Sequence, residues 1–230
     1  MSDSTTSTGS PPKLQDENHS VVKAAGVIGV ATFSSRILGF VRDMVLARLF
    51  GATPAADAFF VAFRIPSLLR ELFAEGSMSS AFIPVFTEYR TMRTKQEAWE
   101  LASAVFTTLL TIVTVVTVVG ILAAPWLVQI LAPGFQANPE KLALTTLLTR
   151  VMFPYLLFIS LAALAMGILN SVRAFAVPAF SPLFLNVFII GCALYVSPHL
   201  PEPIIGAAIG VVAGGAAQFF MQLPSLKLRG

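Results

Sequence analysis

Apolar runs long enough to cross a lipid bilayer follow one another along most of this chain. One of them contains VFTTLLTIVTVVTVVGILAA, in which no residue is charged. Its many β-branched residues would also suit a strand, but a strand needs only about 4–8 residues, whereas a membrane helix needs about 20. The length of the run therefore predicts a membrane helix. With 56% hydrophobic and 12% charged residues, the chain also has too little polar material to cover a water-soluble globule.

The pattern predicts an all-α, polytopic membrane protein with six transmembrane helices. A short amphipathic helix at the membrane surface is expected over residues 77–93, where apolar residues recur at helical spacing and a basic, polar end follows. Residues 1–20 are rich in Ser, Thr, Pro and charge and are expected to form a disordered tail. The expected spans cover about residues 22–49, 55–74, 98–124, 141–169, 174–196 and 204–223.

Two local features refine this prediction. Pro66, Pro154, Pro178 and Pro182 lie inside the expected spans and predict bends, because proline cannot donate to the helical ladder. The segment GAAIGVVAGG, residues 206–215, has small residues at a spacing typical of close helix–helix packing.

Lys and Arg are distributed unequally over the predicted loops. The three loops near residues 51–54, 125–140 and 197–203 contain neither residue. Because cytoplasmic loops carry an excess of positive charge, this asymmetry supports the six-span prediction and places the N-terminus in the cytoplasm. The positive residues on the N-terminal side are Lys13, Lys23, Arg90, Arg93, Lys95, Arg173, Lys227 and Arg229.

Six of the ionised residues in the first two spans stand among neighbours otherwise suited to hydrocarbon. Each costs about 2.5–3.5 kcal/mol at bilayer depth, so such groups normally face a wet cavity or a partner. A seven-residue spacing, as from Arg36 to Asp43, puts two side chains on nearly the same helix face, and the second span repeats it. We therefore expect pairing between the two helices around a polar cavity. The candidate site residues are Arg36, Arg42, Asp43, Asp57, Arg64 and Arg70.

Arginine exceeds acid in this set, which favours a phosphate-bearing substrate, since the guanidinium fork binds phosphate oxygens bidentately. A second interpretation needs no substrate: Arg36, Arg64 and Arg70 snorkel to the interface, and Arg42 simply neutralises Asp43. Asn186 is interpreted as a residue that hydrogen-bonds between helices.

Other function classes find no support in the sequence. It has no GxxxxGK[ST] phosphate loop, no HExxH, no paired CxxC and no GxSxG motif. Its basic residues are spread among apolar runs rather than gathered on one solvated face, as nucleic acid would require. We expect no catalytic residue, no cofactor, no bound metal and no nucleic-acid partner.

Several linked motifs give the chain a specific resemblance. The segments SSRILGFVRDMVLARLFGA, ADAFFVAFRIPSLLRELFAEG and SAFIPVFTEY follow one another between residues 34 and 89. In this order and spacing they resemble the bacterial lipid II flippase family, also called MurJ or MviN. The match is dense over residues 26–90 and looser beyond, where NSVRAFAVPAFSP continues it.

The resemblance implies a fold and an activity. The fold is that of the multidrug/oligosaccharidyl-lipid/polysaccharide exporter superfamily, with two six-helix lobes around a central cavity. The implied activity is movement of the undecaprenyl-diphosphate-linked peptidoglycan precursor across the bacterial inner membrane by alternating access. Position by position, the family's cavity arginines correspond to Arg36, Arg42 and Arg70, and its acids to Asp43 and Asp57. Where the family usually has a second basic residue after Arg70, this chain has Glu71.

The family is about twice as long as this chain, so the resemblance covers the N-terminal lobe. Its implied partners are lipid II, the surrounding membrane lipids, and a C-terminal lobe or a second chain that completes the cavity. Two alternatives stay open at this stage: an exporter of another lipid-linked saccharide or a drug, and a membrane scaffold that does not transport. Drug export would favour an acidic cavity, whereas arginine dominates here.

Overall fold

In the computed structural model, residues 12–71 and 82–229 are described, with side chains from Gly26 onward. The described residues form helices and their connections, without a strand, so the all-α prediction is confirmed. The helices are α1 (Pro12–Phe50), α2 (Pro54–Arg70), α3 (Ile83–Met92), α4 (Lys95–Leu131), α5 (Pro139–Met152), α6 (Pro154–Ser171), α7 (Ala176–Tyr195), α8 (Ile204–Phe220) and α9 (Leu223–Lys227). Two short 3₁₀ turns, η3 (Pro133–Ala137) and η4 (Ser197–His199), lie between them.

Four helical units in the described ranges are long and apolar enough to cross a membrane: Lys95–Leu131, Pro139–Ser171, Ala176–His199 and Ile204–Lys227. They coincide with the last four predicted spans. The first two predicted spans correspond to α1 and α2. Helix α1 is rich in charge, and α2 is only 17 residues long. The count of six is consistent with this arrangement and stays a prediction.

Some boundaries differ from the prediction. Helix α1 begins at Pro12, ten residues before the expected span, so the part of the expected tail from residue 12 onward is helical. Adding residues to an existing helix costs little, because the nucleus is already formed. Helix α4 continues through Pro125 to Leu131. The expected end of the second span and the start of the surface helix fall in residues 72–81, outside the described residues; α3 is the described part of that helix.

Side-chain caps fix where several helices begin. The Thr53 hydroxyl accepts from the backbone N–H of Ala56 at 3.3 Å, immediately before α2. At α4, Thr94 and Glu97 form a reciprocal capping box. These caps satisfy backbone donors that the first helical turn leaves unpaired, and therefore define each start.

The predicted bend at Pro154 is present as a break between α5 and α6. Phe153, at the break, is fully buried, and its ring occupies the space where a Cβ on Gly120 of α4 would lie. The α5–α6 unit is thereby packed tightly against α4.

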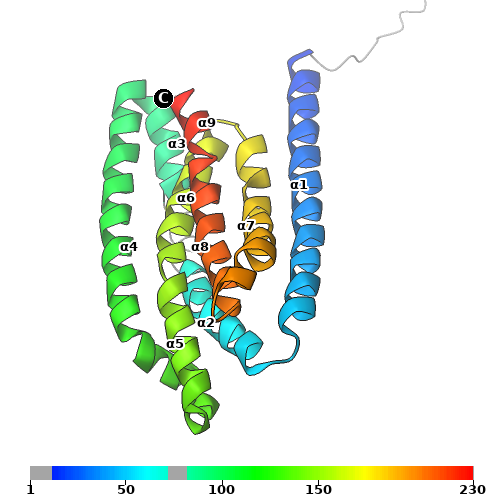
Figure 1. The fold of residues 1–230 in the computed structure, drawn as a ribbon. Helices are drawn as coiled ribbons and strands as arrows, with labels where there is room; N and C mark the ends of the chain where they lie inside the picture. Colours follow the sequence, from blue (N-terminus) through cyan, green and yellow to red (C-terminus); the bar gives the residue numbers. More distant parts are fainter. Residues whose placement is uncertain (1–11, 72–81, 230) are drawn as a thin grey trace, which may run out of the picture.

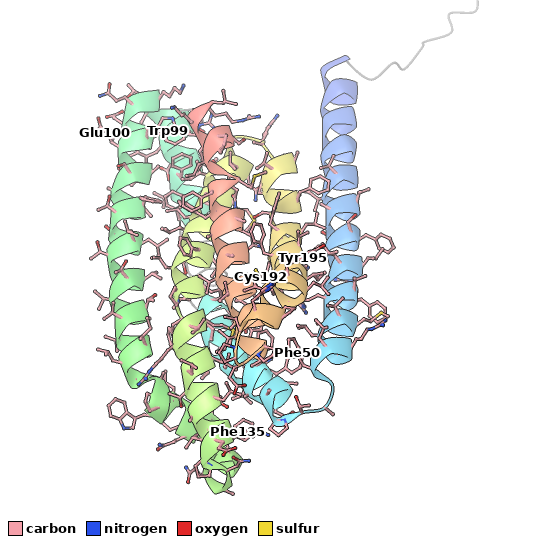
Figure 2. All side chains as sticks on the ribbon, viewed as in Figure 1. Phe50, Trp99, Glu100, Phe135, Cys192 and Tyr195 are labelled. Atoms are coloured by element: carbon pink, nitrogen blue, oxygen red, sulfur yellow. The ribbon has the colours of Figure 1, made fainter. Side chains whose placement is uncertain are left out.

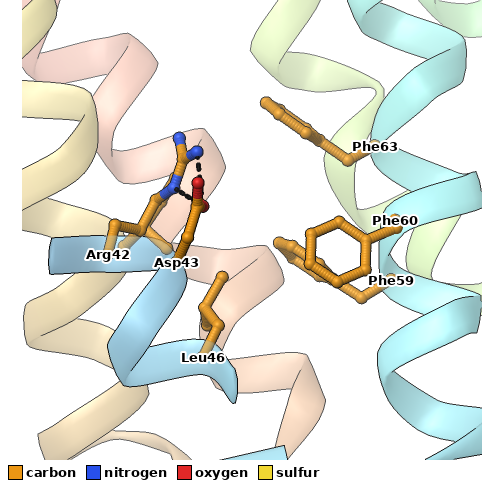
Figure 3. Close-up of a pocket in the computed structure, with 7 residues that line it drawn as sticks. Arg42, Asp43, Leu46, Phe59, Phe60 and Phe63 are labelled. Carbon is orange, nitrogen blue, oxygen red and sulfur yellow. Dashed lines mark hydrogen bonds and ion pairs between the residues drawn. The ribbon is translucent and has the colours of Figure 1, made fainter. Parts of the chain in front are cut away.

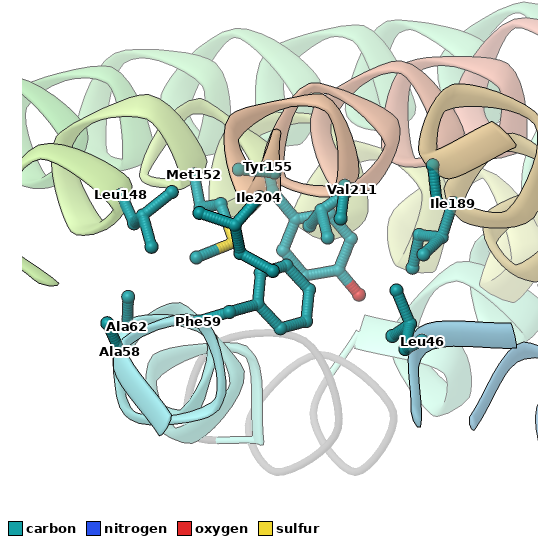
Figure 4. Close-up of a cluster of buried hydrophobic side chains, with 13 residues drawn as sticks. Leu46, Ala58, Phe59, Ala62, Leu148, Met152, Tyr155, Ile189, Ile204 and Val211 are labelled. Carbon is teal, nitrogen blue, oxygen red and sulfur yellow. The ribbon is translucent and has the colours of Figure 1, made fainter. Parts of the chain in front are cut away.

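Small residues let α8 approach α7 backbone to backbone, as predicted. A Cβ on Gly210 would lie 2.7 Å from Cα of Ile189, and one on Gly214 would lie 2.8 Å from Cα of Leu185. The main core surrounds this contact and includes Phe59, Tyr155 and Val211 (Figure 4).

Helix α1 stands at the edge of the bundle (Figure 1), where it packs mainly against α7 and touches α2 little. The N-terminal end of α1, helices α3 and α9, and the α6–α7 connection share one end of the bundle. The α1–α2 connection and Phe135 of η3 lie at the other end (Figures 1 and 2). The two ends correspond to the basic and the Lys/Arg-poor sets of predicted loops.

Candidate functional site

A pocket of about 410 Å³ lies where α1, α2 and α7 meet. Helix α1 contributes one charged pair to it, and α2 contributes an aromatic wall on the opposite side (Figure 3). The residues that line it are Arg42, Asp43, Leu46, Phe59, Phe60, Phe63 and Ile189. Two of the six predicted site residues thus line a common pocket.

The aromatic wall is anchored in the core. Phe59 is 3% exposed and stacks on Phe63 with ring centroids 6.1 Å apart. Phe63 in turn contacts Tyr155 of α6 at 5.9 Å. Phe60, which is 54% exposed, packs edge-on against Phe59 and forms the outer part of the wall. This arrangement gives the pocket a fixed apolar side facing a charged side.

The guanidinium of Arg42 is held by two partners. Its Nε and Nη2 donate to one carboxylate oxygen of Asp43 at 3.0 and 2.7 Å, and its Nη1 donates to the side-chain oxygen of Asn186 at 3.0 Å. The Arg42 side chain is 24% exposed. Charge-assisted hydrogen bonds of this kind orient a guanidinium that would otherwise sample many rotamers.

Asn186 links α7 to two points on α1. It accepts from Arg42, and its amide nitrogen donates to the backbone oxygen of Ser35 at 3.3 Å. Asn186 is 6% exposed. The sequence-based interpretation of Asn186 as a helix–helix hydrogen-bonding residue is confirmed, and its contact with Arg42 adds a role in the pocket that the sequence did not reveal.

The expected pairing between acids and arginines of the first two spans is wrong. Asp43 pairs with its neighbour Arg42 on the same helix, as the second interpretation of the sequence had it. Asp57 pairs with Lys141 of α5, with 2.7 Å between the carboxylate oxygen and Nζ. The reason is that α2 packs closely against α5 and only slightly against α1.

Lys141 is the residue of this region that sequence reasoning missed. Its Nζ also lies 4.0 Å from the centroid of the Phe135 ring, a cation–π contact. Lys141 stands in the first turn of α5, where the positive end of the helix dipole disfavours a cation. That position was only a weak signal of an acidic partner on another helix, because Glu140 in the same turn already supplies a negative charge.

The other three predicted arginines do not line the pocket. Arg36 is exposed on α1, two turns before Asp43 and on nearly the same helix face. Arg64 is exposed on α2, and Arg70, at the end of α2, is half-buried. Arg70 follows Phe59 and Phe63 at helical spacing, so it belongs to the flank of α2 that carries the aromatic wall.

In the described ranges, no group of three or more His, Cys, Asp or Glu side chains is placed to hold a metal ion. The groups that line the pocket are a fixed guanidinium, a carboxylate and an aromatic wall. These groups can bind an anionic or polar group next to an apolar one.

The comparisons with known proteins agree on one family. The model of the family described as "Lipid II flippase MurJ" matches residues 46–230. The chain is 44% identical over 196 residues to the lipid II flippase MurJ of Burkholderia cenocepacia, covering 85% of this chain and 38% of the relative. It is 45% identical over 215 residues to a probable lipid II flippase MurJ of Vibrio cholerae, covering 90% of this chain and 41% of the relative.

A solved structure of a lipid II flippase MurJ in an inward closed conformation superimposes with a TM-score of 0.72 and 31% sequence identity. It covers 86% of this chain, and the chain covers 41% of it. The chain thus spans about two fifths of the length of the relatives it matches. With the family model matching most of its residues and identities above 40% to these relatives, the chain belongs to the lipid II flippase MurJ family.

Proposed function

We propose that this chain is the N-terminal lobe of a flippase that moves lipid II across the bacterial cytoplasmic membrane by alternating access. The substrate is the undecaprenyl-diphosphate-linked peptidoglycan precursor. A C-terminal lobe, or a second chain, completes the cavity. The N-terminus is cytoplasmic, because the basic loops lie at its end of the bundle.

The observation that carries the proposal is the oriented Arg42 guanidinium at a pocket between loosely joined helices. Diphosphate oxygens match the planar guanidinium fork. The Asp57–Lys141 pair strengthens the case, because Asp57 is compensated by a lysine and does not draw on the arginines of α1 and α2. Arg36 and Arg64, which are exposed on α1 and α2, add further positive charge to the same two helices.

The position of the pocket supports alternating access. It lies where α1 and α2 touch little, while α1 stays attached to α7. A second lobe that moves against α1 and α2 would change access to Arg42 without disturbing the core behind Phe59. Arg42 would exchange the Asp43 carboxylate for the substrate's diphosphate, which competes as an anionic partner.

The proposal is tested by replacing Arg42 with Ala in the complete protein, in cells that depend on it for wall synthesis. Growth and wall synthesis should fail while membrane insertion persists. Asp57→Ala is compared in the same cells, and normal growth of both variants would favour a scaffold that does not transport. Tighter binding of another undecaprenyl-diphosphate saccharide than of lipid II would instead favour an exporter of that compound.

The 230-residue chain alone provides a further test in liposomes. It should bind lipid II weakly and should not translocate it, because the opposite wall of the cavity is missing. Translocation at the rate of a full-length relative would contradict the assignment as one lobe.

A further inference from the structure

Two arginines distant in sequence converge on the C-terminal end of α6. Arg90 of α3 donates from Nη1 to the backbone oxygen of Ser171 at 3.1 Å. Arg229, just after α9, donates from Nη1 to the next backbone oxygen, that of Val172, at 3.3 Å. Because the two acceptors are consecutive carbonyls, the two guanidiniums are held close together. We call this place, with Arg173, the α6 corner.

Arg173 adds a third cation to the same point. It follows Val172 directly, is exposed, and adopts a left-handed backbone conformation with φ of 59°. Glycine is the usual residue in that conformation, because a Cβ crowds the backbone there. Arg173 therefore adopts a strained backbone conformation, and it adds a charged side chain to the α6 corner.

The positive charge of the α6 corner exceeds the negative charge that the described residues bring to it. The negative end of the α6 dipole amounts to about half a charge, against three guanidiniums. Among the residues that the structure describes, the ion pairs join Arg42 to Asp43, Arg93 to Glu97 and Lys141 to Asp57, and none involves the α6 corner. Like charges held together in this way favour the binding of an anion.

The surroundings indicate where that anion comes from. Two large apolar side chains of the same segment are open: Leu228, next to Arg229, is 86% exposed, and Phe220, further back on α8 and packed against Phe158, is 55% exposed. Leu228 directly follows the α8–α9 unit and Phe220 lies within it, and the length and hydropathy of this unit suit a membrane span. Cations next to exposed apolar side chains at a span end are typical of the membrane interface, where lipid phosphates lie.

We propose that the α6 corner binds the phosphate of an anionic phospholipid from the leaflet at this end of the bundle, with Leu228 and Phe220 against its acyl chains. Arg90, Arg173 and Arg229 hold the phosphate oxygens through their free N–H groups. The bound lipid ties α3 and α9 to the end of α6 (Figure 1). This site is separate from the Arg42 pocket and does not depend on the transport proposal.

The alternative is that these arginines serve only as topology signals, for which Lys and Arg are equivalent. A triple replacement by lysine, R90K/R173K/R229K, separates the two roles. It keeps the charge and thus the topology, but it removes the planar forks. The matched control is Arg48→Lys, which changes an exposed arginine at the other end of the bundle.

The test measures binding of phosphatidylglycerol and phosphatidylcholine to the purified chain by native mass spectrometry. The chain should prefer phosphatidylglycerol, and the triple lysine variant should bind it roughly tenfold more weakly, as expected when charge-assisted hydrogen bonds are lost. The Arg48→Lys control should bind like the parent chain. Equal binding by the triple variant and the parent would overturn the proposal, as would displacement of phosphatidylglycerol by equimolar lipid II.

A second variant guards against misfolding. Arg173→Gly suits the left-handed backbone at this position and should therefore fold at least as well as the parent chain. It should nevertheless bind phosphatidylglycerol several-fold more weakly, because one fork is gone. Unchanged binding in this well-folded variant would remove Arg173 from the site and contradict the proposal.

Discussion

Two helix contacts on opposite sides of α7 are built in contrasting ways. On one side, α8 approaches the backbone of α7 so closely that Gly210 and Gly214 leave no room for a Cβ. On the other side, α1 lies against α7 through Asn186, which reaches Ser35 and Arg42 by side-chain hydrogen bonds. The contact between α1 and α2 is slight, and the pocket lies between these two helices.

The contrast shows where this bundle is fixed and where it can change. Close backbone contact maximises dispersion interactions and leaves no alternative packing, so α7 and α8 should behave as one body. The contact of α1 with α2 is slight, and the polar bonds that Asn186 adds to the α1–α7 contact are ones that a ligand or a second lobe can replace. Ionised groups occur on the loosely packed side because a charge needs solvent or a partner, and tight apolar packing provides neither.

The sharpest way to break the tight contact is Gly210→Val. The new side chain would collide with the backbone at Phe188 and Ile189, which cannot move without separating the helices. We expect a loss of about 3 kcal/mol or more, as for severe overpacking. The measurement is the thermal unfolding temperature in detergent. Gly191→Val is the matched control, because a Cβ at Gly191 meets nothing within 4 Å, and an equal loss there would argue against the packing explanation.

The polar part of the α1–α7 contact is tested through Asn186. Asn186→Leu removes the acceptor from Arg42 and should weaken binding of lipid II to the complete protein roughly tenfold or more, because a hydrogen bond to a charged group contributes about 1.5–3 kcal/mol. If Asn186 acts by orienting Arg42, the same change should cost almost nothing when Arg42 is already Gln. Additive effects in this double-mutant cycle would mean that Asn186 only holds α1 against α7.

Much of this architecture was predictable because it depends on local patterns. Pro154 removes a backbone donor wherever the helix lies, so the break between α5 and α6 followed from the sequence. The glycine spacing of residues 206–215 likewise indicated a close helix contact before its partner was known. The seven-residue spacing correctly put Arg36 and Asp43 on nearly the same face of α1.

The partners of the charged residues were not predictable in the same way. Seven-residue spacing shows which face a side chain leaves from, but not which helix lies opposite. Asp57 was expected to meet an arginine of the first span, yet α2 packs on α5, some 84 positions away in sequence, and Lys141 is the partner. Asn186 reaches Arg42 across 144 positions for the same reason. Choosing between such pairings requires the order of the helices in space.

The smallest expected effect concerns this Asp57–Lys141 pair, which joins the starts of α2 and α5. The Asp57 side chain is 60% exposed and Lys141 is 16% exposed, so solvent screens much of the attraction. We expect a coupling of about 0.5–1 kcal/mol between Asp57→Asn and Lys141→Gln in thermal unfolding, decreasing with added salt.

The contact with Phe135 should keep Lys141 in place when Asp57 is Asn, because a cation–π contact does not need the carboxylate. Lys141→Gln should therefore still destabilise the Asp57→Asn chain slightly, whereas Phe135→Leu should remove that remainder. If Lys141→Gln has no effect in either background, the pair does not join α2 to α5.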